Sequence, residues 1–162
     1  MLPAEYYLPL KFAHIVSSVL MVGTGFGSAF YMFFANRAGS LPAQAVVSSL
    51  VVRADWWFTL PTVIFQPISG ILLVLMAGWP LTTPWVLLSL LLYAIAGACW
   101  LPVVWLQVRM AKMAQDAVAC GEREVPALYQ TYARRWEGLG YPAFLAMVAV
   151  YWLMVTKPNL WA

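Results

Sequence analysis

The stretch Leu10–Phe34, "LKFAHIVSSVLMVGTGFGSAFYMFF", decides the class of this protein. It contains no acidic residue, and Lys11 and His14 are its only basic side chains. A helix needs about 20 predominantly apolar residues to cross a bilayer, and this stretch supplies them. It lacks the basic start of a signal peptide and its apolar run is too long for one, so we expect it to stay in the chain as a membrane-spanning helix.

The composition extends this prediction to the whole chain. Of its 162 residues, 64% are hydrophobic and only 9% are charged, which is too apolar for a soluble protein. The length leaves room for about four spans of roughly 20 residues each. We therefore expect an all-α integral membrane protein, an antiparallel up-down four-helix bundle that forms one transmembrane domain over residues 1–162. The lipid bilayer is its expected partner, and neither a separate soluble domain nor a nucleic-acid partner is expected.

Apolar runs place the membrane spans and the links between them. We predict spans at residues 12–34, 57–78, 85–106 and 139–155. The turn "WPLTTP" at 79–84 is so short that the helices on either side must be antiparallel neighbours. The longer links, 35–56 and 107–138, are polar, and the second should be helical on both sides of Gly121 with a break near Pro126.

Charge sets the expected orientation in the membrane. The two long links lie on one side of the membrane and carry Arg37, Arg53, Arg109, Lys112, Arg123, Arg134 and Arg135. On the opposite side, where the two termini lie, the only basic side chains are Lys11 and Lys157. By the positive-inside rule the links are cytoplasmic, and both termini face outward, to the periplasm of a bacterial inner membrane that the chain crosses several times. Tryptophans should anchor the helices at the two interfaces: Trp56, Trp57, Trp105 and Trp136 inside, Trp79, Trp85 and Trp161 outside.

His14 is the only histidine of the chain, and it has two interpretations. In the first, the imidazole bonds a carbonyl or water near the interface and anchors the helix, with Lys11 reaching the headgroups beside it. In the second, His14 is an axial ligand to the iron of a haem held within the bundle, because neutral imidazole is a common iron ligand. The haem would then be five-coordinate, or Met154 or Met76, at a similar depth, would be its second ligand.

Other features of the spans leave further alternatives open. Gly23 and Gly27 have the spacing that permits close helix packing, within the bundle, at a dimer face or against a planar ligand. Gln66, with Pro61 and Pro67, should face the bundle interior, because an amide and freed carbonyls are costly in lipid. Arg53, Asp55, Gln107 and Arg109 form either a solvated charged face or a cluster that binds a propionate or a lipid headgroup.

Several function classes lack their signature residues. One histidine without a carboxylate in any predicted span does not make a hydrolytic triad, and no cluster of histidines and cysteines suggests a zinc site. Cys99 lies in an apolar run and Cys120 in a polar one, so no disulfide is expected. Neither inverted repeats nor buried charges suggest a transporter.

The whole chain resembles the small bacterial four-span proteins described only as predicted integral membrane proteins of unknown function. More distantly, it resembles the small haem-b protoporphyrinogen IX oxidase of bacteria (HemJ type). The matching residues are Lys11 and His14 in "LKFAHIV", Arg53 before the second span, Pro61 and Gly70 within it, and "VTKP" at the end of the last. In the third span, Ser89 stands where that oxidase family has a lysine, and "GACW" (97–100) where it tends to carry a histidine.

The resemblance implies a shared scaffold and a shared haem ligand rather than a shared reaction. We expect a membrane protein that binds haem b or a related porphyrin through His14, with Lys11, Arg53, Met76 and Met154 as further cofactor-binding residues, and with an electron-transfer or tetrapyrrole-linked redox role. The alternatives are a cofactor-free scaffold or accessory subunit that forms a homo-oligomer or joins a partner subunit, and a protoporphyrinogen oxidase-like enzyme. Whether the chain is an enzyme stays open.

Overall fold

The computed structural model describes residues 3–160, and the regular structure in this part of the chain is all helical. The main helices are α1 (Tyr7–Arg37), α2 (Leu41–Ala54), α3 (Leu60–Met76), α4 (Pro84–Ala119) and α5 (Ala127–Thr156). A short 3-10 turn, Ala4–Tyr6, precedes α1, and a π-helical turn, Asp55–Thr59, joins α2 to α3. Four continuous helical stretches are long and apolar enough to cross a membrane, which confirms the all-α membrane bundle.

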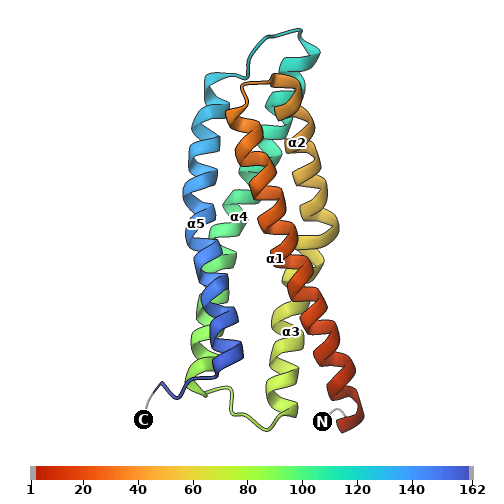
Figure 1. Ribbon diagram of the computed structural model, residues 1–162, viewed down its shortest axis with the longest axis vertical. Helices are drawn as coiled ribbons and strands as arrows, with labels where there is room; N and C mark the ends of the chain where they lie inside the picture. The colour runs from red at the N-terminus through yellow and green to blue at the C-terminus, as the bar shows by residue number, and fades with distance from the viewer. Residues whose placement is uncertain (1–2, 161–162) are drawn as a thin grey trace.

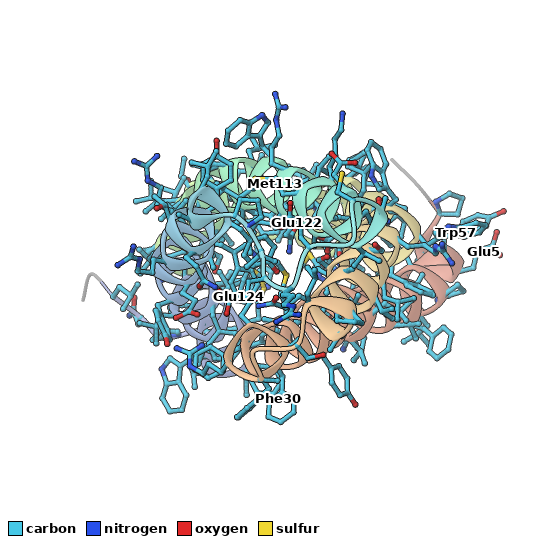
Figure 2. All side chains as sticks on the ribbon, turned by 90° about the horizontal axis from the view of Figure 1, so that it is seen from above. Glu5, Phe30, Trp57, Met113, Glu122 and Glu124 are labelled. Carbon is cyan, nitrogen blue, oxygen red and sulfur yellow. The ribbon has the colours of Figure 1, made fainter. Side chains whose placement is uncertain are left out.

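The helices run up and down the bundle, and both ends of the described chain lie at the same end of it (Figure 1). We call this the terminal end; it also carries the turn between α3 and α4. The opposite end, the link end, carries the α1–α2 turn at 38–40 and the α4–α5 loop at 120–126. Seen from the link end, Glu122 and Glu124 lie over the middle of the bundle, whereas Phe30 and Trp57 point outward (Figure 2).

Residues 35–56 differ most from the expected polar link. α2, the π-turn and α3 follow one another without a break, and together they form one membrane-length helical stretch, Leu41–Met76. The buried side of α2 packs on α4 and α1 and carries the polar Gln44 and Ser48 beside Leu41 and Val51, while the apolar Leu50 is exposed. The polar residues of this segment therefore lower its hydropathy but lie inside the bundle, where they do not interrupt the helix.

Residues 107–138 follow the prediction closely. α4 ends at Ala119, Gly121 has a positive φ of 71°, and α5 begins directly after Pro126. Glycine adopts this left-handed conformation without the steric cost of a Cβ atom, and proline is favourable at the start of a helix. Both helices continue to the link end. With 36 residues, α4 is about 54 Å long, and it therefore extends well beyond a hydrocarbon core of about 30 Å.

The bundle surface is apolar where lipid would surround it. Phe12, Leu101 and Val155 are 71%, 65% and 80% exposed, and such side chains are stable only against a hydrophobic solvent. The chain is therefore a multi-pass integral membrane protein in contact with lipid.

Two buried clusters hold the ends of the bundle together. At the link end, side chains of α1, α2, α4 and α5 meet around the fully buried Met110, Ala114 and Tyr129. At the terminal end, Val74 of α3 packs with Trp85 and Val86 of α4 and Leu153 of α5. Between these clusters α1 and α5 stand apart (Figure 1).

Pro67 leaves a free carbonyl that α4 satisfies. A proline has no N–H, so the carbonyl four residues earlier, Val63, loses its helical partner. The Tyr93 hydroxyl donates to this oxygen at 2.6 Å. An unpaired carbonyl costs several kcal/mol in lipid, so this bond fixes α4 against α3 in a region where the two helices meet through side chains.

Two of the predicted tryptophan anchors lie inside the bundle. Trp85 and Trp136 are each only 5% exposed, because Trp85 belongs to the terminal-end cluster and Trp136 to a polar network described below. Trp56, Trp57 and Trp105 are at least half exposed, as interfacial anchors should be. Trp161 lies outside the described residues.

Candidate functional site

A cavity of about 600 Å³ lies between α1, α4 and α5, with the π-turn and the start of α3 closing its inner side. We call it the α1/α5 cavity. Its walls are mostly apolar, and on α1 they extend from Met21 to Phe34, which corresponds to about 20 Å along the helix axis. Elongated cavities of this size are typical of small-molecule sites.

Aromatic side chains edge the cavity on the side where α1 and α5 stand apart. Phe26, Phe30 and Phe34 follow one another at helical spacing on α1, and Tyr141 and Phe144 face them from α5. The rings of Phe26 and Phe144 stack with centroids 5.5 Å apart. All five rings are between 41% and 62% exposed, so this edge is in contact with the surrounding lipid.

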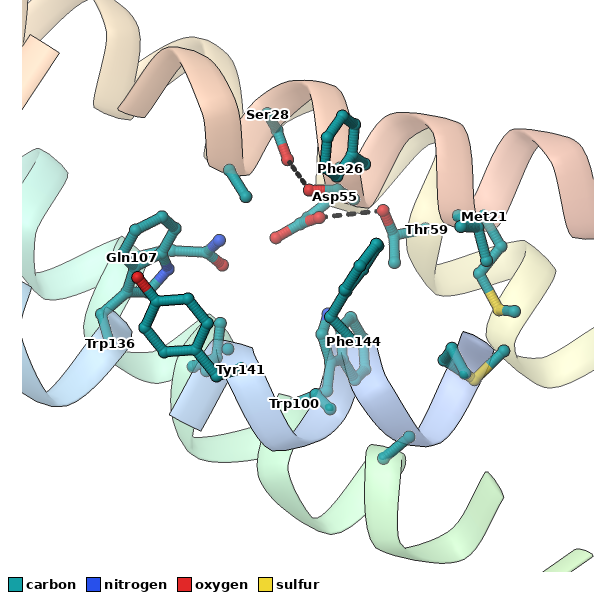
Figure 3. Close-up of a pocket in the computed structure, with 18 of the residues that line it drawn as sticks. Met21, Phe26, Ser28, Asp55, Thr59, Trp100, Gln107, Trp136, Tyr141 and Phe144 are labelled. Atoms are coloured by element: carbon teal, nitrogen blue, oxygen red, sulfur yellow. Dashed lines mark hydrogen bonds between the residues drawn. The ribbon is translucent and has the colours of Figure 1, made fainter. Parts of the chain in front are cut away.

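The polar end of the cavity is built around the buried carboxylate of Asp55, which is 5% exposed. The Thr59 hydroxyl donates to Asp55 Oδ1 at 2.8 Å. The Gln107 amide, with its nitrogen toward Asp55, donates to Oδ2 at 2.7 Å and accepts the indole N–H of Trp136 at 3.2 Å. Figure 3 shows Asp55 and Gln107 pointing toward one another across this end of the cavity.

The π-turn aims Asp55 into the cavity. The N–H of Leu60 bonds the carbonyl of Asp55, five residues back, and Pro61 follows directly. One extra residue in a helical turn rotates everything before it by about 100° relative to an uninterrupted helix. As a result Asp55, Thr59 and Val63 line one face, while the neighbouring Arg53 is exposed on another. Such π-turns occur frequently at functional sites.

An ion pair joins α1 and α5 beside the polar end. Arg37 binds Glu137 through two hydrogen bonds, of 2.8 and 3.1 Å, and its guanidinium lies 3.3 Å from the centre of the Phe33 ring. Glu137 and Phe33 both line the cavity. The Arg37 charge is thus committed to Glu137, and in the described part of the chain this is the one ion pair.

His14, the predicted iron ligand, lies outside this cavity, in the contact between α1 and α3. Its Nδ1 is 2.7 Å from the Ser69 hydroxyl, its backbone oxygen accepts a 2.8 Å bond from Gln66, and its ring packs against Gly70. A Cβ atom at Gly70 would be 3.3 Å from His14 Cε1, so this glycine permits the close approach. The interior position predicted for Gln66 is confirmed, since only 6% of it is exposed.

The tautomer of His14 depends on its partner, the Ser69 hydroxyl. This hydroxyl oxygen lies 2.7 Å from both the carbonyl oxygen of Phe65 and His14 Nδ1. When the hydroxyl donates to the Phe65 carbonyl, Nδ1–H donates to the hydroxyl oxygen, and Nε2 keeps the lone pair that an axial imidazole needs.

The other predicted cofactor residues are not gathered around His14. Lys11 is exposed, with its ammonium 5.9 Å from the Tyr7 ring, and Arg53 is exposed on α2. Met76 lies six residues beyond Gly70, roughly 9 Å further along α3, and Met154 is 36% exposed on α5. Imidazole is a common iron ligand, whereas among the described residues none of these four, nor His14 itself, lines the α1/α5 cavity.

The structure divides the predicted cluster of Arg53, Asp55, Gln107 and Arg109. Asp55 and Gln107 point inward and bond one another, whereas both arginines are exposed, Arg109 against the Trp105 ring. The signal for the inward pair was an acid placed between valines and aromatics in "VVRADWWF", with no cation three or four residues later to pair with it.

The structure also tests the predicted packing role of Gly23 and Gly27. A Cβ atom added at either glycine would have no other atom within 4 Å, so neither is packed against another helix of this bundle.

No group of three or more histidine, cysteine or acidic side chains in the described chain is placed to hold a metal ion. Chemically, the cavity offers a long apolar wall, polarisable rings and one buried carboxylate that accepts hydrogen bonds. Such a site can hold an apolar body and orient it by one polar end.

Comparison with known proteins identifies the family. No curated protein and no solved structure matches the chain. The family described as predicted integral membrane protein (DUF2269) matches residues 8–158, nearly the full length. The chain therefore belongs to the DUF2269 family of predicted integral membrane proteins.

Proposed function

We propose that this protein binds a membrane-soluble amphiphile in the α1/α5 cavity, with the polar head of the ligand at Asp55 and its apolar body along the aromatic wall. The observation that carries the proposal is the buried Asp55 carboxylate at one end of a long apolar cavity. A carboxylate is costly to bury, and a purely structural role does not require it to face open space.

The axis of the cavity supports an amphiphile. Asp55 is followed directly by the exposed Trp56 and Trp57, which belong at the level of the lipid headgroups. From there the cavity extends toward Met21 and Met147, where the surrounding helix surface is apolar. A ligand in the cavity would therefore have the same orientation as a lipid of the adjacent leaflet and would enter sideways between α1 and α5.

A cavity-filling variant tests this proposal. No atom lies within 4 Å of a Cβ added at Gly97, which lines the cavity, so Gly97→Leu would fill part of it without a clash at Cβ. The control is Gly23→Leu, equally free of contacts, exposed and outside the cavity. The probe is a diazirine analogue of dodecanol, photolysed with the protein in phosphatidylcholine nanodiscs and mapped by peptide mass spectrometry.

We expect the probe to label cavity residues in the parent and in Gly23→Leu, and this labelling to fall at least about fivefold in Gly97→Leu, as expected when about 1 kcal/mol of binding is lost. Equal labelling of the cavity in all three proteins, or labelling confined to outward residues, would contradict the proposal.

We propose as a second function that haem b or a related porphyrin binds through His14, in the bacterial inner membrane with the link end cytoplasmic. The bond between His14 Nδ1 and Ser69 supports this proposal, because it leaves Nε2 as the ring nitrogen that would bind iron. Bound haem would supply one-electron redox chemistry for an electron-transfer or tetrapyrrole-linked role. Ser69 would orient the imidazole, and Gly70 would give the ring its room.

A dithionite-reduced-minus-oxidised visible spectrum tests the haem proposal on the purified parent and on His14→Ala. Haem bands that disappear in a folded His14→Ala protein, and that shift in Ser69→Ala, are the expected result. A colourless parent after haem supplementation would leave His14 as a helix-packing residue and favour the cofactor-free scaffold, in which a homo-oligomer or a partner subunit packs on Gly23 and Gly27.

A further inference from the structure

The Asp55 carboxylate offers a ligand of the α1/α5 cavity only hydrogen-bond acceptors. A carboxylate has about four lone-pair positions, and Asp55 uses one on each oxygen, toward Thr59 and Gln107. The Thr59 hydroxyl proton and the Trp136 indole proton are both spent inside this network. What Asp55 still has to offer a ligand is acceptor capacity.

No cation of the described chain forms an ion pair with Asp55 at this end of the cavity. The partners of Asp55 are an alcohol and an amide, both uncharged. Arg37 is bound through two hydrogen bonds to Glu137, the second carboxylate that lines the cavity. Arg37 and Glu137 neutralise each other, so an ionised Asp55 is left without a positively charged partner among the described residues.

From this we infer that the ligand of the cavity is a cationic amphiphile, an apolar chain with a protonated amine head that binds the Asp55 carboxylate. The inference rests on the proposed function and names its ligand class. An ammonium has three donors and no acceptor, which complements Asp55, whereas a carboxylate or phosphate head would bring like charge to a buried site. Glu137 adds to this discrimination, because it too would repel an anion if its pairing with Arg37 loosened.

Head-group competition tests the inference. The diazirine analogue of dodecanol labels the cavity, and unlabelled dodecylamine, dodecanol or laurate is added at equal mole fraction in the nanodisc lipid, at mildly alkaline pH where laurate is ionised and the amine is protonated. For the parent we expect dodecylamine to suppress labelling at a concentration at least about tenfold lower than laurate, with dodecanol between them.

Two variants separate the Asp55 charge from membrane partitioning. In Asp55→Asn the acceptor charge is gone, so the preference for dodecylamine over laurate should fall to about the ratio set by partitioning. The control is Asp116→Asn, which removes an exposed carboxylate of α4 outside the cavity and should keep the parent ratio.

The outcomes distinguish the inference from the proposed function. If the probe does not label the cavity, the proposed function fails. If the probe labels the cavity but laurate competes as well as dodecylamine in the parent, the cavity is a ligand site and the amine inference is overturned. This second comparison needs no variant, so it holds even if Asp55→Asn does not fold.

Discussion

At the scale of single residues, Gln107 holds two groups that would otherwise be unpaired in the interior. Its amide nitrogen bonds Asp55 and its oxygen receives the indole N–H of Trp136. All three side chains are at most 5% exposed, so water does not replace a lost partner. Gln107 is therefore as important for the polar end of the cavity as Asp55 itself.

Replacing Gln107 with leucine should destabilise the protein by about 1–3 kcal/mol, because a buried carboxylate oxygen and an indole N–H each lose a partner. The measurement is the free energy of unfolding in mixed detergent micelles. Gln130→Leu is the control, since Gln130 is exposed on α5, and it should change the stability by no more than about 0.5 kcal/mol. If both variants lost the same free energy of unfolding, the pairing of Asp55 and Trp136 by Gln107 would not be what stabilises the protein.

The residues of the polar end were visible in the sequence, but their direction was not. Asp55, Gln107, Arg53 and Arg109 all occur near a predicted membrane boundary, and a surface cluster was the simplest interpretation. The π-turn separates Asp55 from Arg53 by turning the helix, and no sequence period reports such a turn. The ligand role of His14 stays a prediction, and its contact with Ser69 and Gly70 depends on how α1 crosses α3.

At the scale of elements, the ion pair of Arg37 and Glu137 joins α1 to α5 at one end of the cavity edge, and the stacked rings of Phe26 and Phe144 join them further along. Side-chain exposures of 49% and 20% mean that the ion pair contributes little to overall stability. Its effect should instead be on how easily the two helices separate for a ligand to pass.

Arg37→Gln should accordingly lower the free energy of unfolding by less than about 1 kcal/mol, while it speeds the exchange of a bound ligand. Exchange is measured as the rate at which excess dodecanol protects the cavity from the diazirine probe. Arg135→Gln is the control, because Arg135 is exposed on α5 and has no ion pair within the described chain. An unchanged exchange rate in Arg37→Gln would show that the cavity opens elsewhere.

The elements themselves were largely predictable, with one exception of physical interest. Long apolar runs and the turn at Gly121 and Pro126 give local signals that the structure follows. Residues 41–54 looked like a link because Gln44, Ser48, Ser49 and Arg53 lower the hydropathy. Their helix is stabilised by the packing of α2 on α4, a tertiary contact that hydropathy does not report.

At the scale of the whole molecule, the class of the protein follows from composition, whereas its orientation is a prediction from charge. The orientation is testable with Cys120, which is exposed at the link end, whereas Cys99 is half-buried. If the link end is cytoplasmic, a membrane-impermeant maleimide should modify Cys120 in inverted vesicles and not in intact cells. Modification in intact cells, lost in Cys120→Ser, would reverse the topology.

The central claim is that an amphiphile lies along the α1/α5 cavity with its head at Asp55. The most direct measurement maps two isomeric dodecanol probes, one with the diazirine next to the head and one with it at the tail end. The account predicts head-proximal labels near Gln107 and Trp136, and tail-end labels near Met21 and Met147. Labels from both probes on outward residues of the same depth, such as Val19 and Leu91, would show lipid contact without a bound ligand and would contradict it.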